Sequence, residues 1–125
     1  MTIEHYQQTL LAWLSTFCKV YRGAVPDTEK KPLPSPHIVY SPVSTTFSTS
    51  FSQPLYLYAP GATEFTALTA LADRIIAAVG VGGLHIRNGD GCIRIEHGNP
   101  LYQDRPDYPD KNCKAGYLLL NITIY

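Results

Sequence analysis

Charged residues are scarce in this chain of 125 residues: they make up 16% of it, and ten lysines and arginines balance ten aspartates and glutamates. An average globular domain carries about 25%. DNA binding depends on a basic patch, and a net charge of zero supplies no large one, so we expect no sequence-specific nucleic-acid partner. The low charge predicts either a surface largely covered by neighbouring subunits or a wet, uncharged surface rich in tyrosine, threonine, serine and proline.

Long apolar runs and paired cysteines are also missing. No apolar run approaches about 18 residues and the first residues lack a basic n-region, so neither a membrane span nor a signal peptide is expected. We expect a protein that is made in a cytoplasm and stays soluble there, or leaves only as part of a particle. The cysteines Cys18, Cys92 and Cys113 form no CxxC pair, which argues against a zinc ribbon and favours buried free thiols.

Motifs for catalysis and for cofactor binding are absent as well. The chain contains no GxSxG and no HExxH, and the glycines of residues 80–83 follow a helical pattern, whereas a phosphate-binding loop precedes its helix. Residues 88–91, Asn-Gly-Asp-Gly, lack the later glutamate of a calcium loop. We therefore predict no enzymatic activity, no cofactor and no metal.

The histidines and the aspartate-rich stretch leave one alternative open, a small α+β enzyme or ligand-binding domain. His85 and His97 fall on the two arms of a predicted hairpin, and Asp104 and Asp107 follow in a polar stretch. Solvated histidines and loop aspartates interleaved with prolines are the commoner explanation. The alternative requires a deep pocket that holds one of these histidines together with one of these aspartates.

Two helices are expected where apolar residues recur every three or four positions. The first begins after Thr2 as N-cap and continues to Gly23. The second begins after Thr63 as N-cap, with Glu64 at its positive end, and ends at Gly80.

Strands are expected over most of the remaining chain. Alternating patterns predict strands at residues 37–40, from Val43 through Thr45, Phe47 and Thr49 to Phe51, at residues 53–59 with a break or an edge position at Pro54, and at residues 117–125. Asn-Gly and Asp-Gly between residues 84–87 and 92–97 predict a tight hairpin. The proline-rich residues 26–36 predict an extended linker, and residues 98–114 a long polar loop.

This order of elements predicts one α+β domain spanning residues 1–125. We expect a mainly antiparallel, mixed β-sheet with two main helices packed on one side of it and a protruding β-hairpin.

Two stretches of the second half resemble a known family. The run Pro54-Leu55-Tyr56-Leu57-Tyr58-Ala59-Pro60-Gly61-Ala62-Thr63 precedes a helix, and Gly98-Asn99-Pro100-Leu101-Tyr102-Gln103-Asp104 precedes the last strand. Over residues 40–125 the chain is similar to the minor capsid proteins of tailed bacteriophages, the tail terminators of long, flexible-tailed phages.

The resemblance implies a structural virion protein. Such a protein forms a ring, usually of six subunits, that caps the tail tube, stops its polymerisation and provides the joint to the head-side connector. Its partners are then itself, the tail-tube protein and the head–tail connector protein, and DNA passes through the ring. The implied location is the head-proximal end of the virion tail, after assembly in the host cytoplasm. A head–tail connector or stopper is the alternative within virion assembly.

A ring requires complementary patches on two sides of each subunit, and tyrosine and arginine are favoured in such patches. Exposed tyrosines at positions 56, 58 and 117 would suit them. The interface candidates lie on the hairpin and in the stretch after it: Arg87, Asn88, Asp90, Arg94, Tyr102, Asp104, Arg105 and Tyr108.

Overall fold

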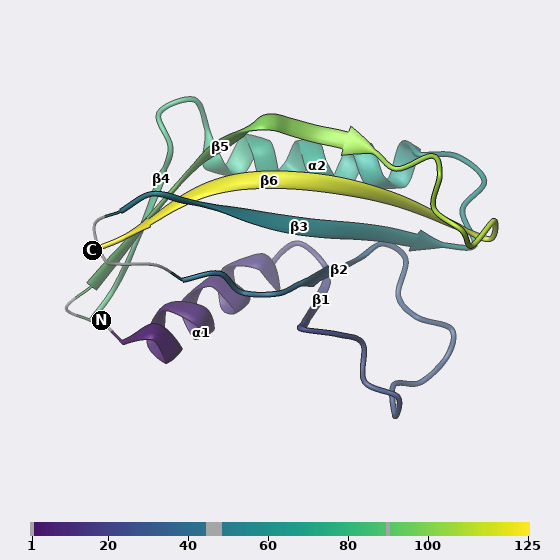
Figure 1. Cartoon of the computed structure of the whole chain (residues 1–125), viewed down its shortest axis with the longest axis horizontal. Helices are drawn as coiled ribbons and strands as arrows, with labels where there is room; N and C mark the ends of the chain where they lie inside the picture. The colour runs from purple at the N-terminus through teal and green to yellow at the C-terminus, as the bar shows by residue number, and fades with distance from the viewer. Residues whose placement is uncertain (1, 45–48, 90) are drawn as a thin grey trace.

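The computed structural model describes residues 2–44, 49–89 and 91–125, without the side chain of Asn88. In chain order the elements are α1 (Ile3–Leu14), β1 (Lys19–Arg22), β2 (His37–Tyr40), β3 (Phe51–Pro60), α2 (Thr66–Val79), β4 (Leu84–Asn88), β5 (Gly91–Asp104) and β6 (Cys113–Ile124). The strands form one sheet in the order β1-β2-β3-β6-β5-β4 (Figure 1). β1 and β2 are parallel and the other neighbours are antiparallel. The predicted α+β class with a mixed sheet is confirmed.

The first helix begins where the sequence predicts and ends earlier. The hydroxyl of Thr2 caps α1 by accepting a hydrogen bond from the amide of His5. The predicted continuation to Gly23 is wrong, because α1 ends at Leu14 and a strand, β1, follows. In that strand Val20 and Tyr21 are buried by parallel pairing with β2. Burial against a distant strand overrides a local helical period.

The second helix also differs from the prediction at its start. Phe65 is the N-cap of α2 and makes no capping hydrogen bond through its side chain, so Thr63 and Glu64 lie before the helix. The Phe65 ring packs partly buried against the core instead, which gives this helix end an apolar anchor. Gly80 ends α2 as predicted, with a φ of 74° that favours glycine.

β3 runs through Pro54 without a break. Pro54 pairs with Leu119 of β6, while on the other side the pairing with β2 ends at Val39 opposite Tyr56. Pro54 therefore has a strand neighbour on one side only, which is the edge position, one of the two expected alternatives. The buried side chain of Gln53 completes the open side: its amide nitrogen donates to the carbonyl of Ser41 and its oxygen accepts from the amide of Val43.

The serine- and threonine-rich strand predicted before β3 does not form at Val43 or Thr49, which lie outside any strand. Thr45 and Phe47 lie outside the described residues. The chain enters the sheet only at Phe51.

The predicted loop of residues 98–114 is wrong over 98–104 and 113–114, which are strand, and is confirmed over 105–112. β5 continues to Asp104 through a register shift between His97 and Tyr102, and β6 begins at Cys113. Pro100 is accommodated because it lies in the irregular stretch, where ladder hydrogen bonds are interrupted. The connection that remains is residues 105–112.

The predicted hairpin is confirmed as the β4–β5 pair. Its protrusion is not confirmed, because β5 pairs along its other side with β6 from Ile93 onward. The hairpin is therefore one edge of the sheet and β1 is the other. The proline-rich connection between β1 and β2 leaves the sheet as an irregular loop, at the end of the molecule away from the two chain termini (Figure 1).

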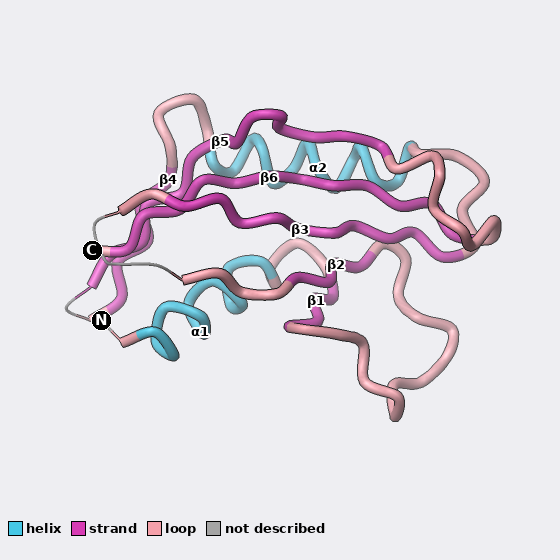
Figure 2. The backbone as a smooth tube through the Cα atoms, viewed as in Figure 1, coloured by secondary structure: helices cyan, strands magenta, loops and turns pink. Residues whose placement is uncertain are grey.

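Alternation along the strands gives the sheet two unlike faces. The core face packs against both helices in a single cluster that includes Tyr6 and Leu10 of α1 and Leu71 and Ile75 of α2. In Figure 2, α2 lies behind β5 and β6 and leaves their near side without a helix. We call this other side the outer face. It holds the alternate residues of the strands, including Tyr56, Tyr58 and Tyr117.

Candidate functional site

A row of four rings crosses the outer face at one end of the sheet. Tyr21 of β1 and His37 of β2 lie edge to face with their centroids 5.6 Å apart. The His37 ring stacks on Tyr58 of β3 at 5.5 Å, because the two residues are register partners. Tyr58 in turn lies 5.5 Å from Tyr108, which the connection between β5 and β6 supplies. Four segments far apart in the sequence thus form one aromatic surface.

Arg105 joins this row to a second aromatic pair. Tyr56 and Tyr117, register partners on β3 and β6, lie 5.6 Å apart. The guanidinium carbon of Arg105 lies 5.4 Å from the centroid of Tyr56 and 5.6 Å from that of Tyr108. The Arg105 amide donates a hydrogen bond to the carbonyl of Ala115, which holds the start of the connection against β6. Each cation–π contact contributes roughly 0.5–1 kcal/mol at a partly exposed site.

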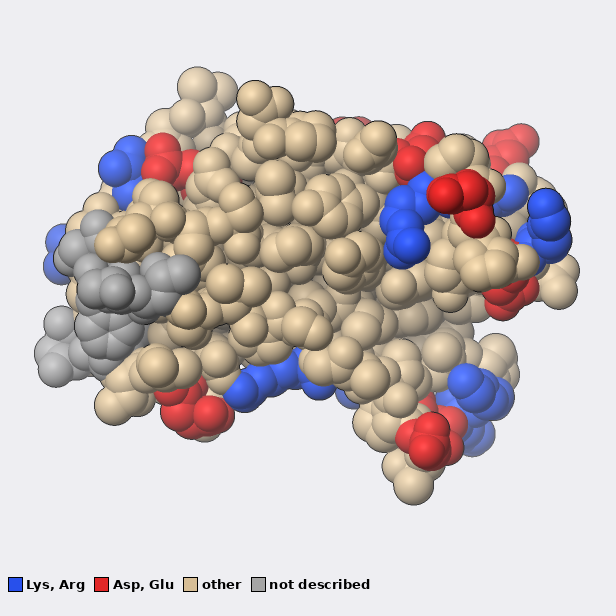
Figure 3. Space-filling model, in the orientation of Figure 1, with Lys and Arg blue, Asp and Glu red and all other residues tan. Residues whose placement is uncertain are grey.

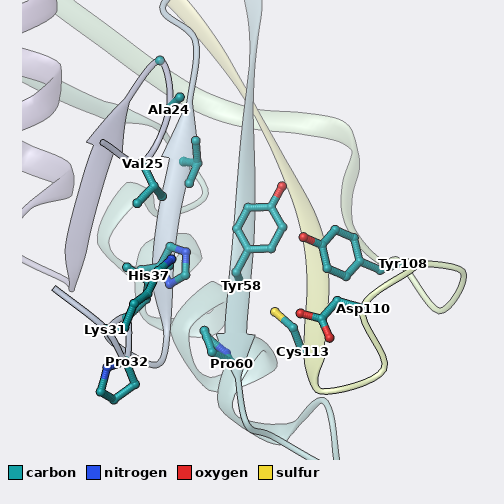
Figure 4. A pocket seen from close by; sticks show the side chains of 13 residues that line it. Ala24, Val25, Lys31, Pro32, His37, Tyr58, Pro60, Tyr108, Asp110 and Cys113 are labelled. Carbon is teal, nitrogen blue, oxygen red and sulfur yellow. The ribbon is translucent and has the colours of Figure 1, made fainter. Parts of the chain in front are cut away.

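A cavity of about 520 Å³ opens beside the aromatic row, and we call it the His37 cavity. His37, Tyr58 and Tyr108 form one part of its wall, and Val25 and Pro32 of the proline-rich connection face them (Figure 4). Apolar groups dominate this lining. The polar groups at the cavity come from His37, the tyrosines, Lys31, Asp110 and Cys113.

A second hollow of about 440 Å³ lies on the same face and is lined by Tyr56, Pro100, Gln103, Arg105 and Tyr117. Because Arg105 contacts the rings of both Tyr56 and Tyr108, it separates the two hollows. We call the two hollows with the rings between them the outer-face groove. In Figure 3 the middle of this face, over β3 and β6, is uncharged, and the charged atoms gather at the ends and the lower rim.

Burial shifts the pKa values of three groove residues, His37, Tyr108 and Cys113, in the direction that favours their neutral forms. His37 is 3% exposed, and its burial lowers the pKa of the ring; its Nδ1–H donates to the Pro34 carbonyl at 2.7 Å, which partly opposes that effect, and Lys31 lowers the pKa further. Burial raises the pKa of the Tyr108 hydroxyl and of the Cys113 thiol. Neutral aromatic and thiol groups in an apolar hollow suit the burial of apolar partner groups.

Of the predicted interface residues whose side chains the structure describes, two lie in this groove, Arg105 and Tyr108. Tyr102 and Asp104 lie on the other side of β5, where the Tyr102 hydroxyl donates to Oδ1 of Asp104 at 2.9 Å. The Tyr102 ring covers Gly116 so closely that a Cβ built there would be 2.5 Å from the hydroxyl oxygen. Tyr102 therefore packs against the core, Asp104 is exposed beside it, and neither residue extends the groove.

The remaining candidates lie at the hairpin end. Arg87 is exposed on β4, and Arg94 of β5 forms an ion pair with Glu96 at 3.4 Å. The Nε of Arg94 is buried and has no hydrogen-bond partner among the described residues. Asn88 ends β4, and Asp90 lies outside the described residues.

His37 is the groove residue that sequence reasoning missed. Its place beside Tyr58 depends on the pairing of β2 with β3 and on the connection that folds back over it. The tyrosines at positions 56 and 58 could be predicted to share one face of a strand, since they alternate with Leu55 and Leu57.

The pocket required by the ligand-binding alternative is not present among the described residues. His85 is exposed on the outer face opposite Arg94, whereas His97 faces α2 and lies 3.0 Å from the Ile76 carbonyl through its Nε2. Neither histidine lines the His37 cavity, nor does Asp104 or Asp107. These groups belong to separate parts of the surface.

Within residues 2–44, 49–89 and 91–125, no three histidine, cysteine, aspartate or glutamate side chains are grouped to hold a metal ion. In the same residues neither helix is long and apolar enough to span a membrane. Comparison with protein-family models, curated proteins and solved structures finds no match to this chain.

Proposed function

We propose that this protein is a structural subunit of a tailed bacteriophage, a tail terminator that forms a ring on the last turn of the tail tube. The ring, of six subunits, stops tube polymerisation and presents a joint to the head–tail connector. The observation that carries the proposal is the outer-face groove, a half-buried aromatic surface that no helix of the described chain covers. The family resemblance of residues 40–125 supports the specific role.

The chemistry of the groove is that of a protein–protein interface. Interfaces are enriched in tyrosine and arginine and depleted in lysine, glutamate and aspartate at their centre. Here Arg105 contacts the rings of Tyr56 and Tyr108, and the other charged groups visible on this face gather at its ends and its lower rim (Figure 3). A chain with 16% charged residues has few groups to desolvate when such a surface is covered.

The two edges of the sheet also differ from each other, and both can meet a neighbouring subunit. β1 and β4 are its edge strands, so each has one side without a partner strand. A closed ring uses heterologous contacts, in which one patch of a subunit meets a different patch of the next. The hairpin end with Arg87 and Arg94 and the groove end with Arg105 and Tyr108 are the two patches, which assigns interface roles to these predicted residues.

In this role the protein needs no catalytic group and no cofactor. Its partners are its own copies, the tail-tube protein and the head-side connector, and DNA passes through the ring without being read. It is assembled in the host cytoplasm and ends at the head-proximal end of the virion tail.

The test is the mass of the purified protein in solution, measured by light scattering and inspected by negative-stain microscopy, alone and with the tail-tube protein of the same phage. Rings, or short tubes capped at one end, are the expected result. A protein that neither binds nor shortens the tubes contradicts the terminator role. Binding to the connector without any effect on the tube would identify it as a connector or stopper.

A matched pair of variants tests the groove itself. Tyr117→Asp places a charge in the groove, whereas Tyr125→Asp places one on the exposed last residue. We expect the first to abolish ring formation and the second to leave it intact. Equal ring formation by both variants would exclude the groove as the interface.

A further inference from the structure

His37 is the most deeply enclosed polar side chain in the wall of the His37 cavity, since only 3% of it is exposed. Its ring stacks on Tyr58, and Tyr21 lies edge to face with it. Its Nδ1 lies 2.7 Å from the carbonyl oxygen of Pro34. The ring is therefore held by three neighbours, and the edge that they leave free lines the cavity (Figure 4).

The Pro34 carbonyl decides which nitrogen of His37 carries the proton. A carbonyl oxygen only accepts hydrogen bonds, so Nδ1 is the protonated nitrogen of the neutral ring and Nε2 keeps its lone pair. Nε2 has no hydrogen-bond partner among the described residues. An acceptor in mostly apolar surroundings gains free energy when a donor reaches it. The cavity therefore presents one acceptor, at a fixed place, to a ligand.

The rest of the wall suits a flat apolar ligand. Tyr58 and Tyr108 supply aromatic rings on one side, and Val25 and Pro32 face them (Figure 4). The volume of about 520 Å³ falls within the range of roughly 300–1,000 Å³ that small-molecule sites occupy. Such sites combine mostly apolar walls with a few polar groups that fix the orientation of the ligand. A molecule of two fused aromatic rings can bury both faces here while one donor meets Nε2.

The charges at the cavity favour a neutral ligand. Lys31 and Asp110 both line it, and because one is a cation and the other an anion, they leave no net charge for a ligand to balance. Burial and the nearby Lys31 lower the pKa of His37, which keeps Nε2 free of a proton at neutral pH. A donor on an uncharged ring is therefore the best match to this wall.

We propose that the His37 cavity is a binding site for a neutral aromatic molecule of two fused rings that carries one hydroxyl group. The hydroxyl donates a hydrogen bond to Nε2 of His37, and the rings lie between the two tyrosines and the proline-rich connection. The inference goes beyond the ring function and does not depend on it. Tyr117, whose replacement tests ring formation, lines the second hollow and not this cavity.

Two probes that differ by one methyl group test the hydrogen bond. Naphthol carries the hydroxyl donor, and its methyl ether has the same rings without a donor. Both fluoresce, so titration of the unaltered protein gives two dissociation constants, at a pH about one unit above the ordinary histidine pKa of about 6.5. We expect naphthol to bind about fivefold more tightly than the ether, which is the contribution of one hydrogen bond.

Two histidine-to-phenylalanine variants show whether the donor meets His37. His37→Phe keeps a ring beside Tyr58 and removes Nε2, so the preference for naphthol should disappear. His85→Phe is the matched control, at an exposed histidine of β4 outside the cavity wall, and should keep the preference. Tyr117→Asp should keep it as well. Circular dichroism verifies that each variant folds.

Nitrogen NMR of the unaltered protein gives the same information without a variant. The imidazole Nε2 signal of His37 should shift when naphthol is added and stay in place when the ether is added at equal occupancy. This measurement replaces the variant if His37→Phe does not fold.

Equal affinity of the unaltered protein for the two probes, or binding of neither, would overturn the site. A preference for naphthol that survives in His37→Phe, or that is lost in His85→Phe, would overturn its assignment to this cavity. Rings that form from a protein unable to bind naphthol would leave the ring function standing and sink the site. Naphthol binding by a protein that forms no rings would do the reverse.

Discussion

The two faces of β3 and β6 use the same strands for different purposes. On the core face Leu55, Leu57 and Leu118 are fully buried against the helices. One position along, Tyr56 and Tyr117 stay half-buried on a face that no helix of the described chain covers. The core face shows where folding free energy is gained, and the outer face shows which apolar surface folding leaves available for another molecule.

The largest difference is expected between neighbouring residues of β6. Leu118→Ala should lower the free energy of unfolding by about 3 kcal/mol, because it opens a cavity in a fully buried site. Tyr117→Ala should cost about 1 kcal/mol, since it removes an aromatic contact with Tyr56 from a half-buried surface. Urea unfolding of both variants measures the difference, and equal losses would contradict the division into two faces.

The bulge of β5 offers a second test, because there the outer face is closely packed. A Cβ on Gly98 would lie 2.5 Å from the carbonyl oxygen of Leu119, a backbone atom that cannot turn aside. Gly98→Ala should therefore cost about 2 kcal/mol. Gly82→Ala is the control, since no atom lies within 4 Å of its built Cβ. Melting temperatures that fall equally for both would show that Leu119 does not restrict this position.

Arg105 tests the aromatic surface itself. Arg105→Gln should lower stability by roughly 1 kcal/mol, because the guanidinium contacts Tyr56 and Tyr108. Arg87→Gln, at an exposed residue of β4, should change it by less than about 0.5 kcal/mol. Chemical denaturation at low and high salt gives both values. A loss no larger for Arg105 than for Arg87 would mean that the cation–π contacts contribute nothing to folding.

The smallest expected effect is a change in pH dependence. Burial lowers the pKa of His37 in the folded protein, with Lys31, Tyr21 and Tyr58 facing the ring, so the unfolded chain binds this proton more tightly. The contribution of the neutral His37 ring to the free energy of unfolding should therefore be fully present above the ordinary histidine pKa of about 6.5. It should be lost as the pH drops from there towards the pKa of the folded state. His37→Asn should reduce the slope of unfolding free energy against pH in this window. An unchanged slope would show that another group titrates there.

Local patterns in the sequence determined much of the fold. Thr2 as the cap of α1, Gly80 as the end of α2, the Asn-Gly and Asp-Gly hairpin and the alternation around Leu55 depend on neighbours within a few residues. Capping, positive φ angles and period-two burial act over that range, so a sequence alone reveals them. The exposed positions of Tyr56, Tyr58 and Tyr117 could be predicted for the same reason.

The tertiary structure alone decided where distant segments meet. Val20 and Tyr21 became a strand because parallel pairing with β2 buries them, and residues after the bulge joined β5 because β6 offered a partner. The groove arises only when His37, Tyr58 and Tyr108 come together from three segments. The pairing of distant segments depends on the free energy of the whole sheet, so a local sequence pattern does not predict it.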